Sequence, residues 1–285
     1  MNKLLARLLR KHLNVSSSKE VPTALNKFIT SCDIAFDDLA IQQSRAQHAL
    51  SLVSEELLEK NEEIENNKEK IEKLLFNILP KSIIKRVLNN EPNIADFIPC
   101  ANVMFADITN FTTISNKIGV SKTVQFLNDI FTVFDEISNK YQIKKIKIIG
   151  DCYMAVSGIK TEQHNHTDAI IHASHDMIIN FSKIIVNYNI YSELRIGINS
   201  GPIIAGVIGR SIFNYDIWGN TVNMASRMES SGSGNTIQIT KKTYSLLSQE
   251  IKESFKPRGY IDVKGRRKIY TYTKKVRVEE MGKVK

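Results

Sequence analysis

The sequence of 285 residues has few cysteines and no long uninterrupted hydrophobic run. Its three cysteines, Cys32, Cys100 and Cys152, are widely spaced and odd in number, which argues against a disulfide framework and a four-ligand zinc site. A membrane-spanning helix needs roughly 18–20 apolar residues in succession, and no such run occurs. The opening MNKLLARLLRKHL interleaves basic residues with leucines, so it lacks the apolar core of a signal peptide. We therefore expect a cytoplasmic protein without a transmembrane segment.

Acidic residues are scarce at the C-terminal end of the chain. Residues 256–285 contain eleven Lys and Arg against three acids, whereas the first 255 residues carry 28 basic and 27 acidic side chains. The formal charge of +9 therefore comes almost entirely from one end. A nucleic-acid footprint should instead be spread over a surface, so we expect no nucleic-acid partner. Residues 278–285 are expected to form a basic tail.

The segment before Pro80 has helical texture throughout. Residues 1–48 are predicted to form a helical module, with a possible break at Ser16-Ser17-Ser18 and Pro22. Residues 49–80 follow a heptad in which one core position is occupied by Leu50, Leu57, Ile64, Ile71 and Ile78. This pattern favours a coiled coil, although Lys60 and Asn67 interrupt the second seam and a single solvated helix is the alternative. Pro80 should end this helix because it cannot continue the hydrogen-bonded ladder.

After Pro80, short apolar runs alternate with amphipathic segments. We expect strands at 102–107, 146–158 (two strands with a turn at Gly150-Asp151), 193–209 (a strand pair) and 236–240, helices at 109–141, 165–187 and 218–229, and at the end a short helix and a terminal strand pair. Strands and helices mixed in this way indicate an α+β fold, in which helices cover a sheet.

Two aspartates follow buried strands and are candidates for metal binding. Asp107 closes the strand at 102–107, and Asp151 lies in the turn forty-four residues later. Aspartates at the ends of neighbouring strands can converge on one edge of a sheet, where their oxygens suit a divalent cation. The backbone N–H groups of residues 108–112 begin the next helix and could hold phosphate. Taken singly, each aspartate is equally an ordinary helix cap or hairpin residue.

Four sequence blocks occur in order: VMFADITNFT, IKIIGDCYMAVSG, LRIGINSGPIIAGVIG and NYDIWGNTVNMASRMES. In order and spacing they resemble the signature blocks of the class III nucleotidyl cyclases, and the resemblance covers residues 98–277. It implies a catalytic domain with a ferredoxin-like, palm-type mixed sheet. It also implies a head-to-tail homodimer, because two catalytic domains share each active site in that family. The segment LLFNILPKSIIKRVL (74–88) resembles the transducing element that precedes such domains.

The resemblance also assigns roles to individual residues. One partner would bind two Mg²⁺ or Mn²⁺ ions through Asp107, Asp151 and the Ile108 carbonyl. The other would supply Asn223 to orient the ribose and Arg227 to stabilise charge on the α-phosphate, and these two lie four apart on one helical face. The remaining expected substrate contacts are Thr109, Asn110, Phe111, Thr112, Arg195 and Lys264. The sequence around Lys264 departs from the family pattern, which leaves open which basic side chain reaches the terminal phosphates.

The base is read by two positions in this family, which are Lys147 and Asp216 here, with Ile217 and Trp218 beside them. Lys147 is a donor suited to adenine N1, and Asp216 is an acceptor suited to the adenine amino group. Guanylate-type members typically carry Glu and Cys instead, so ATP is the expected substrate and cyclic AMP the expected product. The alternatives are a guanylate cyclase or a non-catalytic nucleotide-binding dimerisation module. A diguanylate cyclase would need a G-G-[DE]-E-F turn, which is absent.

Overall fold

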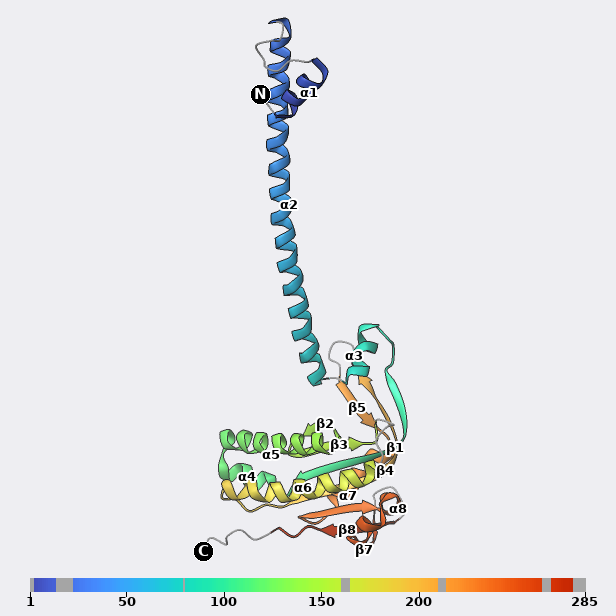
Figure 1. Ribbon diagram of the computed structural model, residues 1–285. Helices are drawn as coiled ribbons and strands as arrows, with labels where there is room; N and C mark the ends of the chain where they lie inside the picture. The colour runs from blue at the N-terminus through green and yellow to red at the C-terminus, as the bar shows by residue number, and fades with distance from the viewer. Residues whose placement is uncertain are drawn as a thin grey trace. The chain divides into compact units, whose positions relative to one another are not determined.

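The computed structural model describes residues 3–13, 23–78, 80–159, 165–209, 214–262 and 268–278. The chain divides into two compact units, Met1–Asn77 and Ile78–Lys285 (Figure 1). Among the helices of the described residues, none combines the length and the apolar character that crossing a membrane requires.

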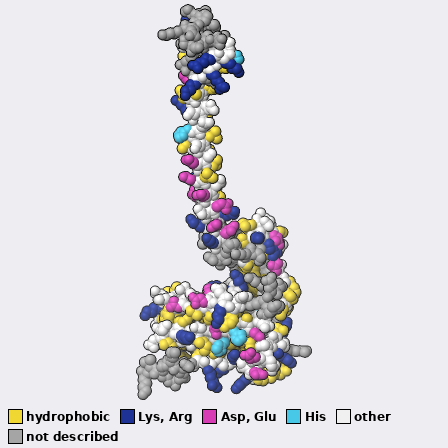
Figure 2. Space-filling model, in the orientation of Figure 1, with side chains coloured by type: hydrophobic (Ala, Val, Ile, Leu, Met, Phe, Trp, Pro, Cys, Tyr) yellow, Lys and Arg dark blue, Asp and Glu magenta, His cyan; other side chains and the backbone are white. Residues whose placement is uncertain are grey.

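The first unit is helical. Helix α1 spans Lys3–Leu13 and α2 spans Thr23–Ile78, so one continuous helix covers most of the predicted helical module and the heptad. The helix ends just before Pro80, as predicted. The predicted break at 16–22 lies outside the described residues. Figure 2 shows hydrophobic side chains among charged ones along α2. The apolar heptad side chains that are largely exposed in the single chain are Leu50, Val53, Leu57, Ile64 and Ile71. The coiled coil stays a prediction.

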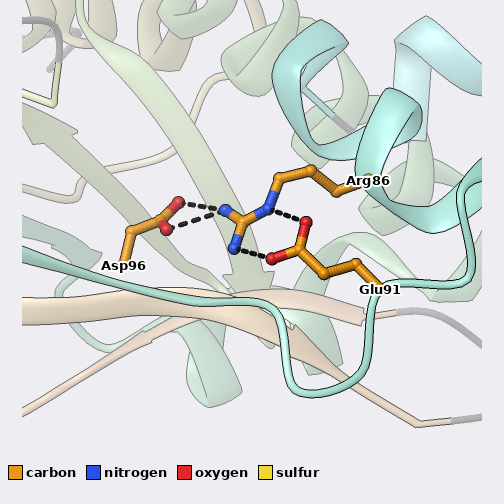
Figure 3. A network of polar contacts seen from close by, with 3 residues as sticks. All are labelled: Arg86, Glu91 and Asp96. Atoms are coloured by element: carbon orange, nitrogen blue, oxygen red, sulfur yellow. Dashed lines mark hydrogen bonds and ion pairs between the residues drawn. The ribbon is translucent and has the colours of Figure 1, made fainter.

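The second unit begins with α3 (Lys81–Leu88), which is tied to the sheet by a network of ion pairs (Figure 3). Arg86 of α3 donates two hydrogen bonds of 2.7 and 2.8 Å to Glu91 and two more of the same lengths to Asp96 on the first strand. A planar guanidinium suits such paired carboxylate contacts. Arg86 therefore links α3 to the loop that follows it and to the first strand of the sheet.

The sheet of the second unit has eight strands, ordered β2-β3-β1-β4-β6-β8-β7, with β5 paired to β4. The strands are β1 (Ala95–Ile108), β2 (Lys144–Ile149), β3 (Cys152–Ser157), β4 (Leu194–Ile208), β5 (Asn214–Trp218), β6 (Thr236–Thr240), β7 (Lys256–Ile261) and β8 (Ile269–Lys275). Among the described strands, β4 and β6 pair in parallel, and the other pairs are antiparallel. This mixed sheet with its helices confirms the predicted α+β fold.

Helices lie on both faces of the sheet. They are α4 (Phe111–Ile118), α5 (Val120–Lys140), α6 (His166–Asn187), α7 (Asn220–Ser230), α8 (Lys241–Leu246) and α9 (Gln249–Glu253). The larger core packs α5 and α6 against one face, with Phe126, Phe134 and Phe181 fully buried. A smaller core on the other face joins Phe105 and Val103 of β1 to α7 through Ala225. The end of β1 therefore presents Asp107 on the face that α7 shares.

Three predicted elements differ in the structure. The helix expected at 109–141 is two helices, because Gly119 adopts a positive φ of 83° between α4 and α5. The strand pair expected at 193–209 is one strand, β4. Pro202 does not break it, because it lies where the β1–β4 register shifts and a missing N–H is tolerated. The second strand of the hairpin is β5, which sequence patterning missed and which carries Asp216.

Candidate active site

Asp107 and Asp151 come together at one end of the central strands. Asp107 lies next to the end of β1 and is opposite Cys152 on β3 and Arg195 on β4. Asp151 immediately precedes Cys152, in a turn where Gly150 adopts a φ of 65°. Burial and the nearby charge of Asp107 both raise the pKa of Asp151. The two aspartates therefore lie at the same end of the adjacent strands β1 and β3, and their role as metal ligands stays a prediction.

The turn after Asp107 leads directly into α4. Ile108 is buried, and Asn110 occupies the left-handed region with a φ of 55°, so that α4 begins at Phe111. No side chain caps this helix, which leaves the first-turn N–H groups near Phe111 and Thr112 without a side-chain acceptor at the N-cap. The N–H of Thr109 differs, because it donates to the Glu193 carbonyl at 2.9 Å. The predicted phosphate cradle therefore begins after Thr109.

Arg195 forms an ion pair with Asp107, which is an expected metal ligand. Its terminal Nη2 lies 2.6 Å from Asp107 Oδ2 and 3.0 Å from Glu229 Oε1. Burial opposes the guanidinium charge, yet the hydrogen bond to Asp107 and the charge of Glu229 leave the pKa of Arg195 raised. In the single chain Arg195 thus neutralises carboxylates, and its expected contact with the triphosphate stays a prediction.

Glu229 is a buried acid that sequence reasoning missed. It is 7 % exposed and lies in the last turn of α7, over β4. Gly197 of β4 allows this close approach, because a side chain there would overlap the backbone of Met228 and Glu229. Burial, together with the charge of Asp107, raises the pKa of Glu229 to about 7. A signal was present in the sequence, since Glu229 shares a helical face with the apolar Val222 and Ala225.

The two predicted base-reading residues form an ion pair. Lys147 Nζ lies 2.5 Å from Asp216 Oδ2, across from β2 to β5. The register between β2 and β3 is irregular at Lys145–Lys147. The other oxygen of Asp216 accepts the N–H of Ile217 at 2.9 Å. Ile217 is buried, and Trp218 pairs with Ile204 on β4. The strands therefore bring together the donor and the acceptor that the sequence suggested.

Asn223 and Arg227 share the outer face of α7. Both are exposed, whereas Met224, Ala225 and Met228 are buried. This arrangement agrees with their spacing of four residues. Lys264 lies outside the described residues. Within one chain the structure thus shows an acidic centre, a Lys–Asp pair and an exposed Asn–Arg pair.

The family model of the adenylate and guanylate cyclase catalytic domain matches residues 95–275. The chain therefore belongs to this family of cyclases, which are lyases. It is 37% identical over 210 residues to an adenylate cyclase of Mycobacterium bovis, covering 73% of this chain and 47% of the relative. It is 30% identical over 260 residues to the receptor-type guanylate cyclase gcy-28 of Caenorhabditis elegans, and the match covers 90% of this chain and 20% of that relative. The chain thus spans between a fifth and about half of these curated relatives.

Solved structures give the same result for the domain. One is the catalytic core of a rhodopsin-guanylyl cyclase with converted specificity in complex with ATPαS (33% identity, TM-score 0.58, 64% of this chain and 98% of that chain). Another is the adenylyl cyclase CyaB from P. aeruginosa (28% identity, TM-score 0.59, 66% of this chain and 99% of that chain). The relatives and neighbours include both adenylate and guanylate cyclases, so membership of the family does not decide the base.

Proposed function

We propose that this chain converts ATP to 3′,5′-cyclic AMP and pyrophosphate. The observation that carries the proposal is the Lys147–Asp216 pair, which offers one donor and one acceptor side by side. Adenine presents an N1 acceptor beside an amino donor, whereas guanine presents the reverse arrangement. A guanine edge would therefore leave polar groups unpaired, at about 1–3 kcal/mol each. We expect the reaction in the cytoplasm, where cyclic AMP would act as an intracellular second messenger.

In the reaction the ribose 3′-oxygen forms a bond to the α-phosphorus as it loses its proton, and the bond from the α-phosphorus to the bridging oxygen breaks to release pyrophosphate. Asn223 would orient the ribose, and Arg227 would stabilise the charge that develops on the α-phosphate. Lys264 and the N–H groups at the start of α4 would bind the remaining phosphates. Each of these groups acts by positioning or by electrostatics, so no covalent intermediate is required.

Asp107 and Asp151, with the Ile108 carbonyl, would hold two Mg²⁺ or Mn²⁺ ions. The donor set fits, because both side chains are hard oxygen ligands. Burial and the charge of Asp107 raise the pKa of Asp151, and a bound cation would offset the repulsion between the two carboxylates. Among the described residues no group of three or more His, Cys, Asp or Glu side chains could hold a metal ion. Substrate phosphates would thus complete the ligand shell. When bound, the ions supply Lewis acidity for the 3′-hydroxyl and neutralise charge on the leaving pyrophosphate.

We further propose a head-to-tail homodimer. The exposure of Asn223 and Arg227 on α7 supports it, because these residues can then reach substrate held by the partner's aspartates. The exposed heptad of α2 supports a parallel coiled coil that sets the two catalytic domains side by side.

The test is to incubate the purified protein with ATP or GTP, each with Mg²⁺ or Mn²⁺, and to measure the cyclic product and pyrophosphate. We expect cyclic AMP from ATP and little product from GTP. Cyclic GMP alone would contradict the base assignment and favour the guanylate alternative. No product from either nucleotide, with nucleotide binding retained, would favour the non-catalytic module.

A further inference from the structure

The side chain of Arg195 is shared between two carboxylates that have different surroundings. Asp107 lies at the end of β1 beside Asp151, whereas Glu229 is buried on the inner side of α7. A single nitrogen of Arg195 contacts both, at 2.6 Å to Asp107 and 3.0 Å to Glu229. The guanidinium therefore has two alternative partners that are within reach without movement of the backbone.

Two atoms of this arrangement lack hydrogen-bond partners. Arg195 Nε and Glu229 Oε1 are the buried side-chain atoms in this condition across the described part of the chain. Glu229 Oε1 already lies 3.0 Å from Arg195 Nη2 in an ion pair but accepts no hydrogen bond, and Arg195 Nε donates none. Buried polar atoms are normally hydrogen-bonded, so this incomplete contact indicates that another state of the site completes it. A rotation of the Arg195 side chain away from Asp107 would pair these atoms. The position of α7 against Gly197 keeps Glu229 in place to receive it.

We propose that Glu229 is a positioning residue for the metal centre: it takes over Arg195 and so frees Asp107 for a divalent cation. This inference rests on the proposed function, because it assumes that Asp107 binds metal. Without Glu229, release of Asp107 would leave a partly buried guanidinium unpaired beside an incoming cation, which is unfavourable on both counts. In this scheme the Glu229 carboxylate holds Arg195 and does not bind the metal, although it also lies close enough to Asp107 for the charge of Asp107 to add to burial in raising the pKa of Glu229.

The test is the binding of Mn²⁺ alone to the full chain, measured from the electron paramagnetic resonance signal of the free ion. We expect Glu229→Gln to weaken Mn²⁺ binding about tenfold, because Arg195 then stays on Asp107. Glu136→Gln removes the same charge from the exposed surface of α5 and should change the binding less than twofold. A Glu229→Gln chain that binds Mn²⁺ as tightly as the parent would overturn the inference.

Arg195→Gln provides the second arm. In an Arg195→Gln background, Glu229→Gln should have less than a twofold effect, because no guanidinium remains to hold Asp107. An undiminished tenfold effect there would mean that Glu229 acts only through its charge, which contradicts a positioning role.

The metal-induced rise in melting temperature separates this role from a general loss of folding. It should shrink in Glu229→Gln while the metal-free melting temperature does not fall, and a fall without loss of the metal-induced rise would count against the inference. Asp107→Ala tests the assumption beneath it. If Asp107→Ala leaves Mn²⁺ binding unchanged, the metal assignment in the proposed function fails and this inference fails with it. If Asp107→Ala weakens Mn²⁺ binding and Glu229→Gln leaves it unchanged, this inference fails and the proposed function stands.

Discussion

The acidic centre around Asp107 and the Lys147–Asp216 pair occupy neighbouring parts of one sheet, yet their charges are organised differently. The acidic centre gathers three carboxylates around one guanidinium, and burial, together with the nearby charge of Asp107, raises the pKa of both Asp151 and Glu229. The other pair has one charge of each sign at 2.5 Å. A site with surplus negative charge is stabilised by cations, whereas a balanced pair can exchange its internal contact for a neutral hydrogen-bonding edge. We therefore expect the acidic centre to hold the metal ions and the Lys147–Asp216 pair to select the base.

The largest effect should come from the acidic centre. Asp107→Ala removes an expected metal ligand, and we expect the rate of cyclic product formation to fall by about 10³-fold or more. The residual activity should keep its preference for ATP over GTP, because Lys147 and Asp216 are untouched. The measurement is product formation at saturating nucleotide and Mn²⁺, with Glu136→Gln as the control. A changed base preference in Asp107→Ala would break the separation between the two regions.

The base-reading pair should respond in the opposite way. The double substitution Lys147→Glu with Asp216→Cys exchanges the donor for an acceptor, and we expect the ratio of kcat/KM for ATP over GTP to fall about 100-fold. The Mn²⁺ concentration that gives half-maximal activity should stay unchanged. Steady-state kinetics with both nucleotides check both statements, and a large shift in the Mn²⁺ requirement would show that the two regions are not independent.

A smaller effect tests whether each active site is assembled from two chains. Equal amounts of Asp107→Ala and Asn223→Ala chains, each retaining only a small residual activity alone, should regain about a quarter of the parent activity on mixing, because half of the dimers are mixed and one of their two sites is intact. Asp107→Ala mixed with Asp151→Ala should regain nothing, since both lesions fall in the same half. Recovery in that control, or none in the first mixture, would argue against shared sites.

The smallest effect is a pH dependence of the metal-free protein. The pKa of Glu229 is about 7 in the folded chain, above its ordinary value of 4.5, so the folded state binds this proton more tightly than the unfolded state. The corresponding stability is fully present below about pH 4.5 and is lost as the pH rises through 7. Urea unfolding between pH 5 and 8 in the presence of a chelator should show this decline, and Glu229→Gln should flatten it. An unchanged slope in that variant would mean that another group is responsible.

Sequence patterns predicted the parts of the site that depend on local structure. The strand ending at Asp107, the turn at Asp151 and the helical face of Asn223 and Arg227 each follow from short-range periodicity. The partnership of Arg195 with Asp107 could not be predicted in this way, because it depends on the register between β1 and β4. Strand β5 was missed for a related reason. The pattern at 193–209 predicts two strands, whereas β4 continues through Pro202 at a shift in its register with β1, and its hairpin partner is β5.

Helix α7 packs closely on Gly197, and its two sides carry different expected site residues. Its inner surface carries Glu229 toward the acidic centre of its own chain, and its outer surface carries Asn223 and Arg227. In a head-to-tail dimer those outer residues would serve the neighbouring site. A small displacement of α7 would then change the positions of residues in both active sites of the dimer. Substrate binding at one site could in this way alter the geometry of the other.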